Sequence, residues 1–163
     1  MTLQKLKTKK EIKAIAEKLR KQGKIIVTTN GSFDLLHAGH IRNLQESKSQ
    51  GDVLIVGLNS DKSIKSYKGK DRPIISEEYR VEMLDAIRFV DYIVLFDEDE
   101  IAVPLITLVR PSVHCNGSQY GENCVEAPAV KKIGARLHLI KESKDKNGKL
   151  STTRIINKIK ELK

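Results

Sequence analysis

Residues 24–49 read KIIVTTNGSFDLLHAGHIRNLQESKS and contain a strand, a loop and a helix in that order. Residues 24–29 are mostly β-branched, which favours a strand. Residues 30–36 form a loop, and a helix is expected over residues 38–49, ending before Gly51. A strand that passes through a short loop into a helix is the basic unit of parallel α/β sheets.

The rest of the chain continues this alternation. Apolar runs of strand length predict strands over residues 53–59 and 92–96, and further strands are expected over residues 112–115 and 136–140. Capping residues and apolar spacing predict helices over residues 8–22, 76–87, 101–109, 124–133 and 152–162, the first with a Thr8–Glu11 capping box and the last capped by Ser151. In the helix after Ser76, the residues expected to face inward are Tyr79, Met83, Leu84 and Ile87. Residues 60–71 are expected to form a polar connection, and residues 145–149 a solvated turn.

Five strands joined by right-handed crossovers predict an α/β fold of the Rossmann-like type. The sheet is expected to be doubly wound, parallel and five-stranded, with helices on both faces. No repeat or linker interrupts the 163 residues, so we expect a single domain over residues 1–163, with the helix in residues 1–22 packed on it or beside it.

The composition is that of an ordinary globular protein, with 39% hydrophobic and 31% charged residues. The apolar runs are too short to cross a bilayer, and the first residues lack the apolar core of a signal peptide. We therefore expect a cytoplasmic protein that makes no membrane contact. Cys115 and Cys124 have neither the spacing of a zinc site nor the number needed for a disulfide framework, so both are expected to be reduced.

The net charge of +9 is compatible with two kinds of partner. A basic protein can bind nucleic acid, but a positive field also attracts small anionic substrates such as nucleoside triphosphates. Aromatic residues make up only 4% of the chain, which leaves few platforms for stacking single strands. Charge alone does not decide between these partners.

The loop after the first strand is the expected ligand site, because ligands of doubly wound sheets bind at the carboxyl ends of the strands. His37 and His40 lie three residues apart at the start of a helix and therefore project from the same face. The unpaired N–H groups of a helix N-terminus suit a phosphate. Gly39 allows close approach of a nucleotide, and Gly31 relaxes the turn out of the strand.

Two histidines at a helix start could also be ordinary surface residues. That interpretation requires the strand, both glycines and the Phe33-Asp34 pair to coincide with the histidine spacing by accident, so phosphate binding is favoured. Phe33 is expected to pack, and Asp34 to fix the loop or cap the helix rather than act as a base.

A second candidate phosphate site lies near the end of the chain. Ser151-Thr152-Thr153-Arg154 places hydroxyls and a guanidinium at the start of the last helix. Alone, this segment would be a good helix cap, but beside the histidine motif it indicates phosphate binding. Lys68 and Arg72, which follow the second strand, supply further cations on the same side of the sheet.

The segment G-x-F-D-x-x-H-x-G-H over residues 31–40 resembles the HxGH signature of the nucleotidylyltransferase superfamily. Further segments make the chain similar to the heptose 1-phosphate adenylyltransferases from about residue 24 to residue 159; they cover residues 28–40, 56–61, 68–69, 72–74, 90–91, 96–99 and 151–156. This family also occurs as the second domain of bifunctional ADP-heptose synthases. Because the chain has no room for their kinase domain, we expect a stand-alone enzyme.

The resemblance implies a reaction and a set of site residues. AMP would pass from ATP to D-glycero-D-manno-heptose 1-phosphate, with release of pyrophosphate, in lipopolysaccharide core synthesis. Mg²⁺ would be bound mainly through the triphosphate, with no protein metal ligand expected, and the protein is expected to be a homodimer that binds no nucleic acid. His37 and His40 are the candidate catalytic residues. The candidates for nucleotide and phosphate binding are Asn30, Gly31, Ser32, Phe33, Gly39, Lys68, Arg72, Asn116, Gly117, Ser151, Thr152, Thr153 and Arg154. The candidates for acceptor binding are Asp34, Asn59, Asp61 and Lys65.

The chain departs from that family in the loop after the fourth strand. Asn116-Gly117-Ser118-Gln119-Tyr120 replaces the usual Lys-Gly-Gly-Asp-Tyr, which leaves the choice of base and of sugar open. Asn116 and Gln119 could hydrogen-bond a base edge or merely shape a turn. His114 and His138 lie in expected strands and are assigned ordinary core or surface roles.

Three alternatives remain at this point. Glycerol-3-phosphate cytidylyltransferase has the same motifs and mechanism with CTP and a different acceptor, and archaeal-type FAD synthetase shares the first motif. A non-catalytic basic module that binds nucleic acid would explain the charge, but not the paired histidines, the glycines or the second helix-start motif.

Overall fold

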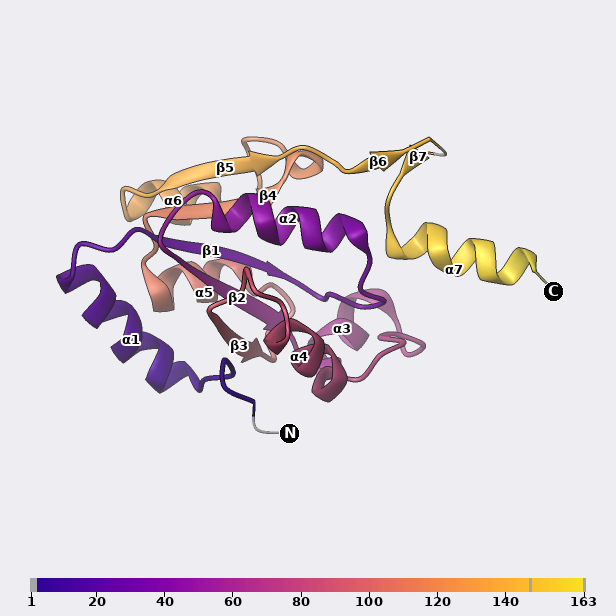
Figure 1. Cartoon of the computed structure of the whole chain (residues 1–163), viewed down its shortest axis with the longest axis horizontal. Coiled ribbons are helices and arrows are strands. Elements are labelled where there is room, and N and C mark those ends of the chain that lie inside the picture. Colours follow the sequence, from indigo (N-terminus) through magenta and orange to yellow (C-terminus); the bar gives the residue numbers. More distant parts are fainter. Residues whose placement is uncertain (1–2, 147, 163) are drawn as a thin grey trace.

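Figure 1 shows the computed structural model, which describes residues 3–146 and 148–162. Its centre is a five-stranded sheet in the order β3-β2-β1-β4-β5, and every neighbouring pair is parallel. The strands are β1 (Ile26–Gly31), β2 (Val53–Asn59), β3 (Tyr92–Phe96), β4 (Val113–Gly117) and β5 (Arg136–Ile140). The predicted doubly wound α/β fold is therefore confirmed.

Helices cover both faces of this sheet (Figure 1). The helices are α1 (Lys9–Lys21), α2 (Ala38–Lys48), α3 (Asp61–Lys68), α4 (Glu77–Asp85), α5 (Ala102–Val109), α6 (Ala127–Lys132) and α7 (Thr152–Glu161). Helix α7 projects beyond the sheet and covers neither face (Figure 1). A 3₁₀ turn spans Ser118–Tyr120, and a short hairpin joins β6 (Lys144–Asp145) to β7 (Gly148–Lys149) before α7. Among the described residues, no helix has the length and apolar character needed to cross a membrane.

Two apolar clusters, one on each face, hold the layers together. Successive strand residues point to opposite faces, so Val27 joins one cluster and its neighbour Ile26 joins the other. The first cluster contains Leu44 of α2 and Leu84 of α4. The second contains residues of α1 and α5, and this contact packs the N-terminal helix against the sheet.

The chain changes direction across the sheet between β1 and β4. It adds β2 and β3 on one side of β1, then crosses to place β4 and β5 on the other side. A crevice is expected at such a reversal, outside the carboxyl ends of the strands. The loop that carries His37 and His40 leaves β1 at this point.

Two sequence predictions for the region after β2 were wrong. Residues 60–71 were expected to be a connection, but most of them form α3, because the Ser60 hydroxyl accepts the Ser63 N–H and Ile64 is buried. In α4, Tyr79 is 63% exposed, whereas Arg80 is fully buried beside Val81 and Leu84.

The helix caps were predicted with mixed success. Thr8 forms the expected capping box with Glu11, and Ser151 caps α7 by accepting the Arg154 N–H. Ser76 precedes α4 but makes no capping hydrogen bond through its side chain. The solvated turn expected at residues 145–149 includes Asn147, which lies outside the described residues.

Candidate active site

Two adjoining cavities open at the carboxyl ends of the strands. The larger lobe has a volume of about 700 Å³ and lies over the ends of β1, β2 and β4. The smaller lobe, of about 270 Å³, lies between the N-termini of α2 and α7. The residues that line both lobes are Ser32, His40, Asn43, Lys68, Gln119, Tyr120 and Ile140.

His37 and His40 are fixed in place by the backbone at the start of α2. Nδ1 of His37 accepts the Gly39 N–H at 3.1 Å, and Nδ1 of His40 accepts the His37 N–H at 3.3 Å. The two rings stack with their centroids 3.9 Å apart and their planes 27° apart. Because each Nδ1 accepts a hydrogen bond, the neutral rings carry their protons on Nε2. The Nε2–H groups are thus the donors available to a ligand.

Both imidazoles are neutral near pH 7. Burial lowers the pKa of His37. Burial, the charge that His37 acquires in acid and the Lys68 charge lower the pKa of His40 to about 4. His37 lines the smaller lobe and His40 lines both, so the pair can donate hydrogen bonds where the two cavities meet.

Gly39 is required by the histidine arrangement itself. A Cβ at this position would lie only 2.8 Å from Cε1 of His37, and 3.3 Å from Cβ of Leu150. Any side chain would displace the His37 ring from its capping position. The glycine therefore keeps the ring in place and the helix N-terminus open to the smaller lobe.

The start of α7 faces the same lobe from the other side. Ser151 and Thr152 line it together with His37 and Gly39. The Thr152 hydroxyl donates to the Asp34 carbonyl at 2.8 Å, which ties α7 to the loop after β1. Two helix N-termini therefore converge on one cavity, an arrangement that favours an anion such as a phosphate. Thr153 and Arg154 line neither lobe, and Nη1 of Arg154 donates to the Gly148 carbonyl at 3.2 Å.

Asp34 holds the loop together from a fully buried position. Its carboxylate accepts hydrogen bonds from Nε of Arg72 at 2.8 Å and from the N–H groups of Ile74 and Ile75. Burial alone would raise the pKa of Asp34, but these hydrogen bonds and the Arg72 charge hold it below its usual range. Neither Asp34 nor Arg72 lines a lobe, which supports the loop-fixing interpretation of Asp34.

Among the residues that the structure describes, Lys68 is the cation that lines both cavities. Its Nζ donates to the Ser32 hydroxyl at 3.0 Å. Burial and the neighbouring Arg72 charge lower the Lys68 pKa, which reflects a crowded cationic region. Lys68 is therefore placed to contact a phosphate, whereas Arg72 is engaged with Asp34.

Arg80, which the sequence patterns did not single out, supports the floor of the site. Its buried guanidinium donates to the Ser32, Asn59 and Ile75 carbonyls at 2.7, 2.8 and 3.0 Å. It also forms an ion pair with Asp61 at 2.7 Å. Asp61 is thus occupied by Arg80, and neither it nor the exposed Lys65 lines a lobe, whereas Asn59 lines the larger one.

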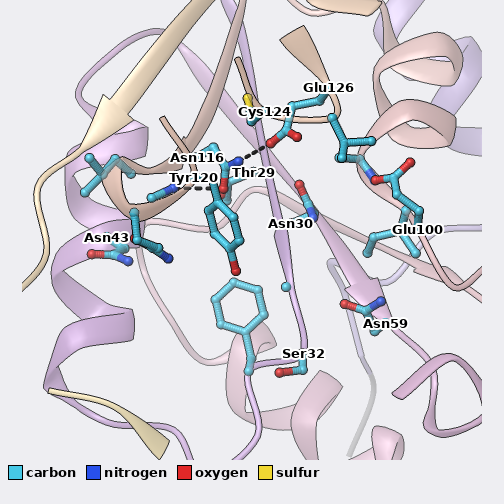
Figure 2. A pocket seen from close by; sticks show the side chains of 18 of the residues that line it. Thr29, Asn30, Ser32, Asn43, Asn59, Glu100, Asn116, Tyr120, Cys124 and Glu126 are labelled. Carbon is cyan, nitrogen blue, oxygen red and sulfur yellow. Dashed lines mark hydrogen bonds between the residues drawn. The ribbon is translucent and has the colours of Figure 1, made fainter. Parts of the chain in front are cut away.

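The β4 side of the larger lobe carries a polar network, shown in Figure 2. Nδ2 of Asn116 donates to the Glu126 carboxylate, and its Oδ1 accepts the Gly117 N–H at 2.8 Å. The Asn116 amide is therefore engaged within the protein, as expected of a residue that shapes a turn. His114 is a buried core residue whose Nδ1 pairs with the Thr28 hydroxyl at 2.9 Å.

Comparisons with known proteins identify the family to which this geometry belongs. Residues 28–158 match the model of the cytidylyltransferase-like family. The chain belongs to this family.

The chain is also similar in sequence to individual curated proteins. The chain is 42% identical to the bifunctional protein HldE of Syntrophotalea carbinolica and 43% identical to that of Campylobacter jejuni subsp. jejuni, over 95% and 98% of its length. It spans only 31–32% of the length of these relatives. These matches and the family model make the chain a nucleotidyltransferase.

Two solved structures are also similar. The lipopolysaccharide core biosynthesis protein of Thermoplasma volcanium is 32% identical, with a TM-score of 0.59 over 76% of this chain and 99% of that chain. The pantoate-beta-alanine ligase of Francisella tularensis is 17% identical, with a TM-score of 0.69 over 93% of this chain and 72% of that one. The second likeness supports the fold alone.

In this family member, the described residues contain no group of three or more His, Cys, Asp or Glu side chains arranged to hold a metal ion. Mg²⁺ commonly enters such sites on substrate phosphates, with few protein ligands and several waters. The donor set of the smaller lobe, which is made of imidazole N–H groups, hydroxyls and helix N-termini, fits the phosphates rather than the ion.

Sequence reasoning missed several residues that line the cavities. Tyr67, Tyr120 and Glu126 are the clearest examples. Tyr67 belongs to the unpredicted α3, and Glu126 lies ten residues from its partner Asn116. No local sequence pattern indicates such contacts. Tyr67 and Tyr120 are 49% and 62% exposed, and only the folded structure shows that both line the cavity.

Proposed function

We propose that this chain transfers AMP from ATP to a heptose 1-phosphate, releases pyrophosphate and so makes an ADP-sugar for lipopolysaccharide core synthesis. The observation that carries the proposal is the convergence of two helix N-termini on the stacked His37–His40 pair. Such an arrangement suits a triphosphate whose α-phosphate changes partners.

In the proposed reaction, an oxygen of the sugar phosphate attacks the α-phosphorus of ATP. A new bond forms between that oxygen and the α-phosphorus, the bond to the oxygen that bridges to the β-phosphate breaks, and pyrophosphate leaves. The protein supplies position and charge stabilisation rather than a covalent nucleophile.

The roles of the residues follow from their places. Nε2–H groups of His37 and His40 donate to phosphate oxygens as negative charge builds on them. Ser151, Thr152 and the α7 N-terminus bind the β- and γ-phosphates, and Lys68 contacts a phosphate at the junction of the lobes. Mg²⁺, held mainly by the triphosphate, would neutralise part of the phosphate charge.

The acceptor occupies the larger lobe. The larger lobe is lined by the amide residues Asn30 and Asn59 and by the acidic residue Glu100. Such groups hydrogen-bond the hydroxyls of a sugar, which favours a polyhydroxylated acceptor over an apolar one. The phosphate of the sugar then lies towards Lys68 and His40.

The relatives support this assignment. The sequence motifs resemble the heptose 1-phosphate adenylyltransferases, and a 32% identical solved structure is that of a lipopolysaccharide core biosynthesis protein. Because the chain matches only about a third of each HldE protein, we propose that it works as one nucleotidyltransferase domain. We further propose that it is a homodimer acting in the cytoplasm.

The decisive test is a pyrophosphate-release screen of ATP, CTP, GTP and UTP against heptose 1-phosphates, glycerol 3-phosphate and other phosphorylated acceptors. We expect ATP with a heptose 1-phosphate to exceed every other pair. CTP with glycerol 3-phosphate as the best pair would replace the proposal by the cytidylyltransferase alternative. Salt-sensitive nucleic-acid binding without any turnover would replace it by a binding module.

A further inference from the structure

Asn43 lies on the same face of α2 as the catalytic motif. It follows Gly39 by four residues and His40 by three, so all three look towards the same side of the helix. Its side chain lines both lobes. Oδ1 of Asn43 is buried, and it accepts no hydrogen bond from any residue that the structure describes.

A buried amide oxygen beside a substrate cavity lowers the stability of the protein unless a ligand donates a hydrogen bond to it, since a buried acceptor without a donor destabilises the folded protein. A neighbouring α2 amide, Gln45, is exposed to solvent and lines neither lobe. Two other buried side-chain atoms of the described residues also lack a hydrogen-bond partner, Ser47 Oγ on α2 and His114 Nε2, but neither residue lines a lobe. Of these three, Asn43 is the one that faces the site.

The surroundings of Asn43 have the composition of a nucleobase site. Tyr120, Gln119 and Ile140 line both lobes with it, and together they offer an aromatic ring, a second amide and an apolar side chain. Figure 2 shows the Asn43 amide and the Tyr120 ring projecting into the same cavity. Tyr120 is 62% exposed, so packing in the core does not account for its position.

We propose that Asn43 selects the base of the nucleotide, with Oδ1 accepting a hydrogen bond from its exocyclic amino group. The inference rests on the proposed function, in which that base is adenine and Oδ1 accepts from N6–H. An amide also carries a donor, which can reach a ring nitrogen of the same edge. The triphosphate then extends from Asn43 past Gly39 to the helix N-termini.

The test compares ATP with inosine triphosphate and with purine riboside triphosphate, which lacks the exocyclic amino group. We measure kcat/KM for each donor in the wild type, Asn43→Leu and Asn43→Ala, with Gln45→Leu as the matched control. Leu and Ala favour helices more than Asn does, so α2 is expected to fold in every variant. Circular dichroism and the thermal midpoint check this.

The wild type and Gln45→Leu should prefer ATP to purine riboside triphosphate by roughly 10- to 100-fold. Asn43→Leu and Asn43→Ala should lose most of that preference through a higher KM for ATP. If both variants fold and keep the wild-type preference, the inference is overturned.

The failure of this inference can be told apart from that of the proposed function. A wild type that uses ATP with another acceptor, and loses its base preference in Asn43→Leu, contradicts only the heptose assignment. A wild type that prefers CTP contradicts the assignment of ATP as the donor. The role of the exocyclic amino group is then measured as the ratio of kcat/KM for CTP to kcat/KM for UTP. If this ratio is unchanged in Asn43→Leu, the inference is overturned.

Discussion

Nδ1 of His40 accepts the backbone N–H of His37, and this bond turns Nε2 of His40 towards the junction of the two cavities. The low pKa of His40, about 4, keeps this ring a neutral donor at physiological pH.

Replacing His40 by alanine should therefore remove one donor to the transition state. We expect His40→Ala to lose about 10²–10³-fold in kcat, with a smaller change in KM. Steady-state pyrophosphate release measures both constants. His138→Ala is the control, because His138 pairs with Glu46 and lines neither lobe. Wild-type turnover in a folded His40→Ala would contradict the mechanism.

The Asp34–Arg72 pair should act on stability more than on chemistry. Removing Asp34 leaves the Arg72 guanidinium and the N–H groups of Ile74 and Ile75 without their acceptor, so Asp34→Ala is expected to lower the free energy of unfolding by roughly 3–5 kcal/mol. A double-mutant cycle with Arg72→Ala, followed by urea denaturation, measures the coupling. We expect it to exceed about 1 kcal/mol. Additive losses, together with a large rise in the KM for ATP in Arg72→Ala alone, would instead make Arg72 a phosphate ligand.

Thr152 joins α7 to the loop after β1 and should influence ATP binding. Loss of its hydroxyl in Thr152→Ala is expected to raise the KM for ATP about fivefold, the effect of one hydrogen bond. Thr152→Ser should restore binding, and Asn157→Ala on the exposed side of α7 should have no effect. If Thr152→Ala and Arg154→Ala both leave KM and kcat unchanged, the second phosphate site has been assigned wrongly.

His114 should make the protein sensitive to acid. Burial lowers its pKa in the folded state to about 4, below the value of about 6.5 of an unfolded histidine. The unfolded chain therefore binds the extra proton first, and the free energy of unfolding falls as pH drops from about 6.5 to 4. Above pH 6.5 this residue adds no pH dependence.

His114→Gln should flatten that dependence. Urea unfolding at pH 7 and pH 4.5 should show that the wild type loses roughly 2–3 kcal/mol more than the variant. Both proteins share the same carboxylates, so their difference isolates His114, including the influence of Glu126 at 3.8 Å. Parallel pH profiles would show that His114 is accommodated as a cation.

The sequence predicted the sheet well because its strands carry strong local signals. The bounds of β2, β3 and β5 agree with the predicted residues. β2 and β3 are short apolar runs with β-branched residues, whereas in β5 Leu137 and Leu139 alternate with polar residues. Helix α3 was missed because most of its residues are polar and only Ser63 and Ile64 are buried. Local patterns do not show that a polar helix is held by its cap.

The sequence motifs of the candidate site were predictable, but the residues that hold its loops in place were much less so. His37, Gly39, Ser151 and Thr152 come together as their helix-start positions suggested. Arg80 was not foreseeable, because its partners lie 5 to 48 residues away and belong to three different segments. The pairing of Asp34 with Arg72 spans 38 residues and likewise depends on the fold.

The Thr152–Asp34 contact joins residues 118 positions apart, and α7 buries none of its residues. During synthesis, all five strands of the sheet emerge from the ribosome before α7, the segment that we propose binds the β- and γ-phosphates. A nascent or clipped chain that stops short of α7 would thus hold its core without a working site. On the proposed assignment, the segment that completes the active site is synthesised after the five-stranded sheet, and none of its residues belongs to the buried core.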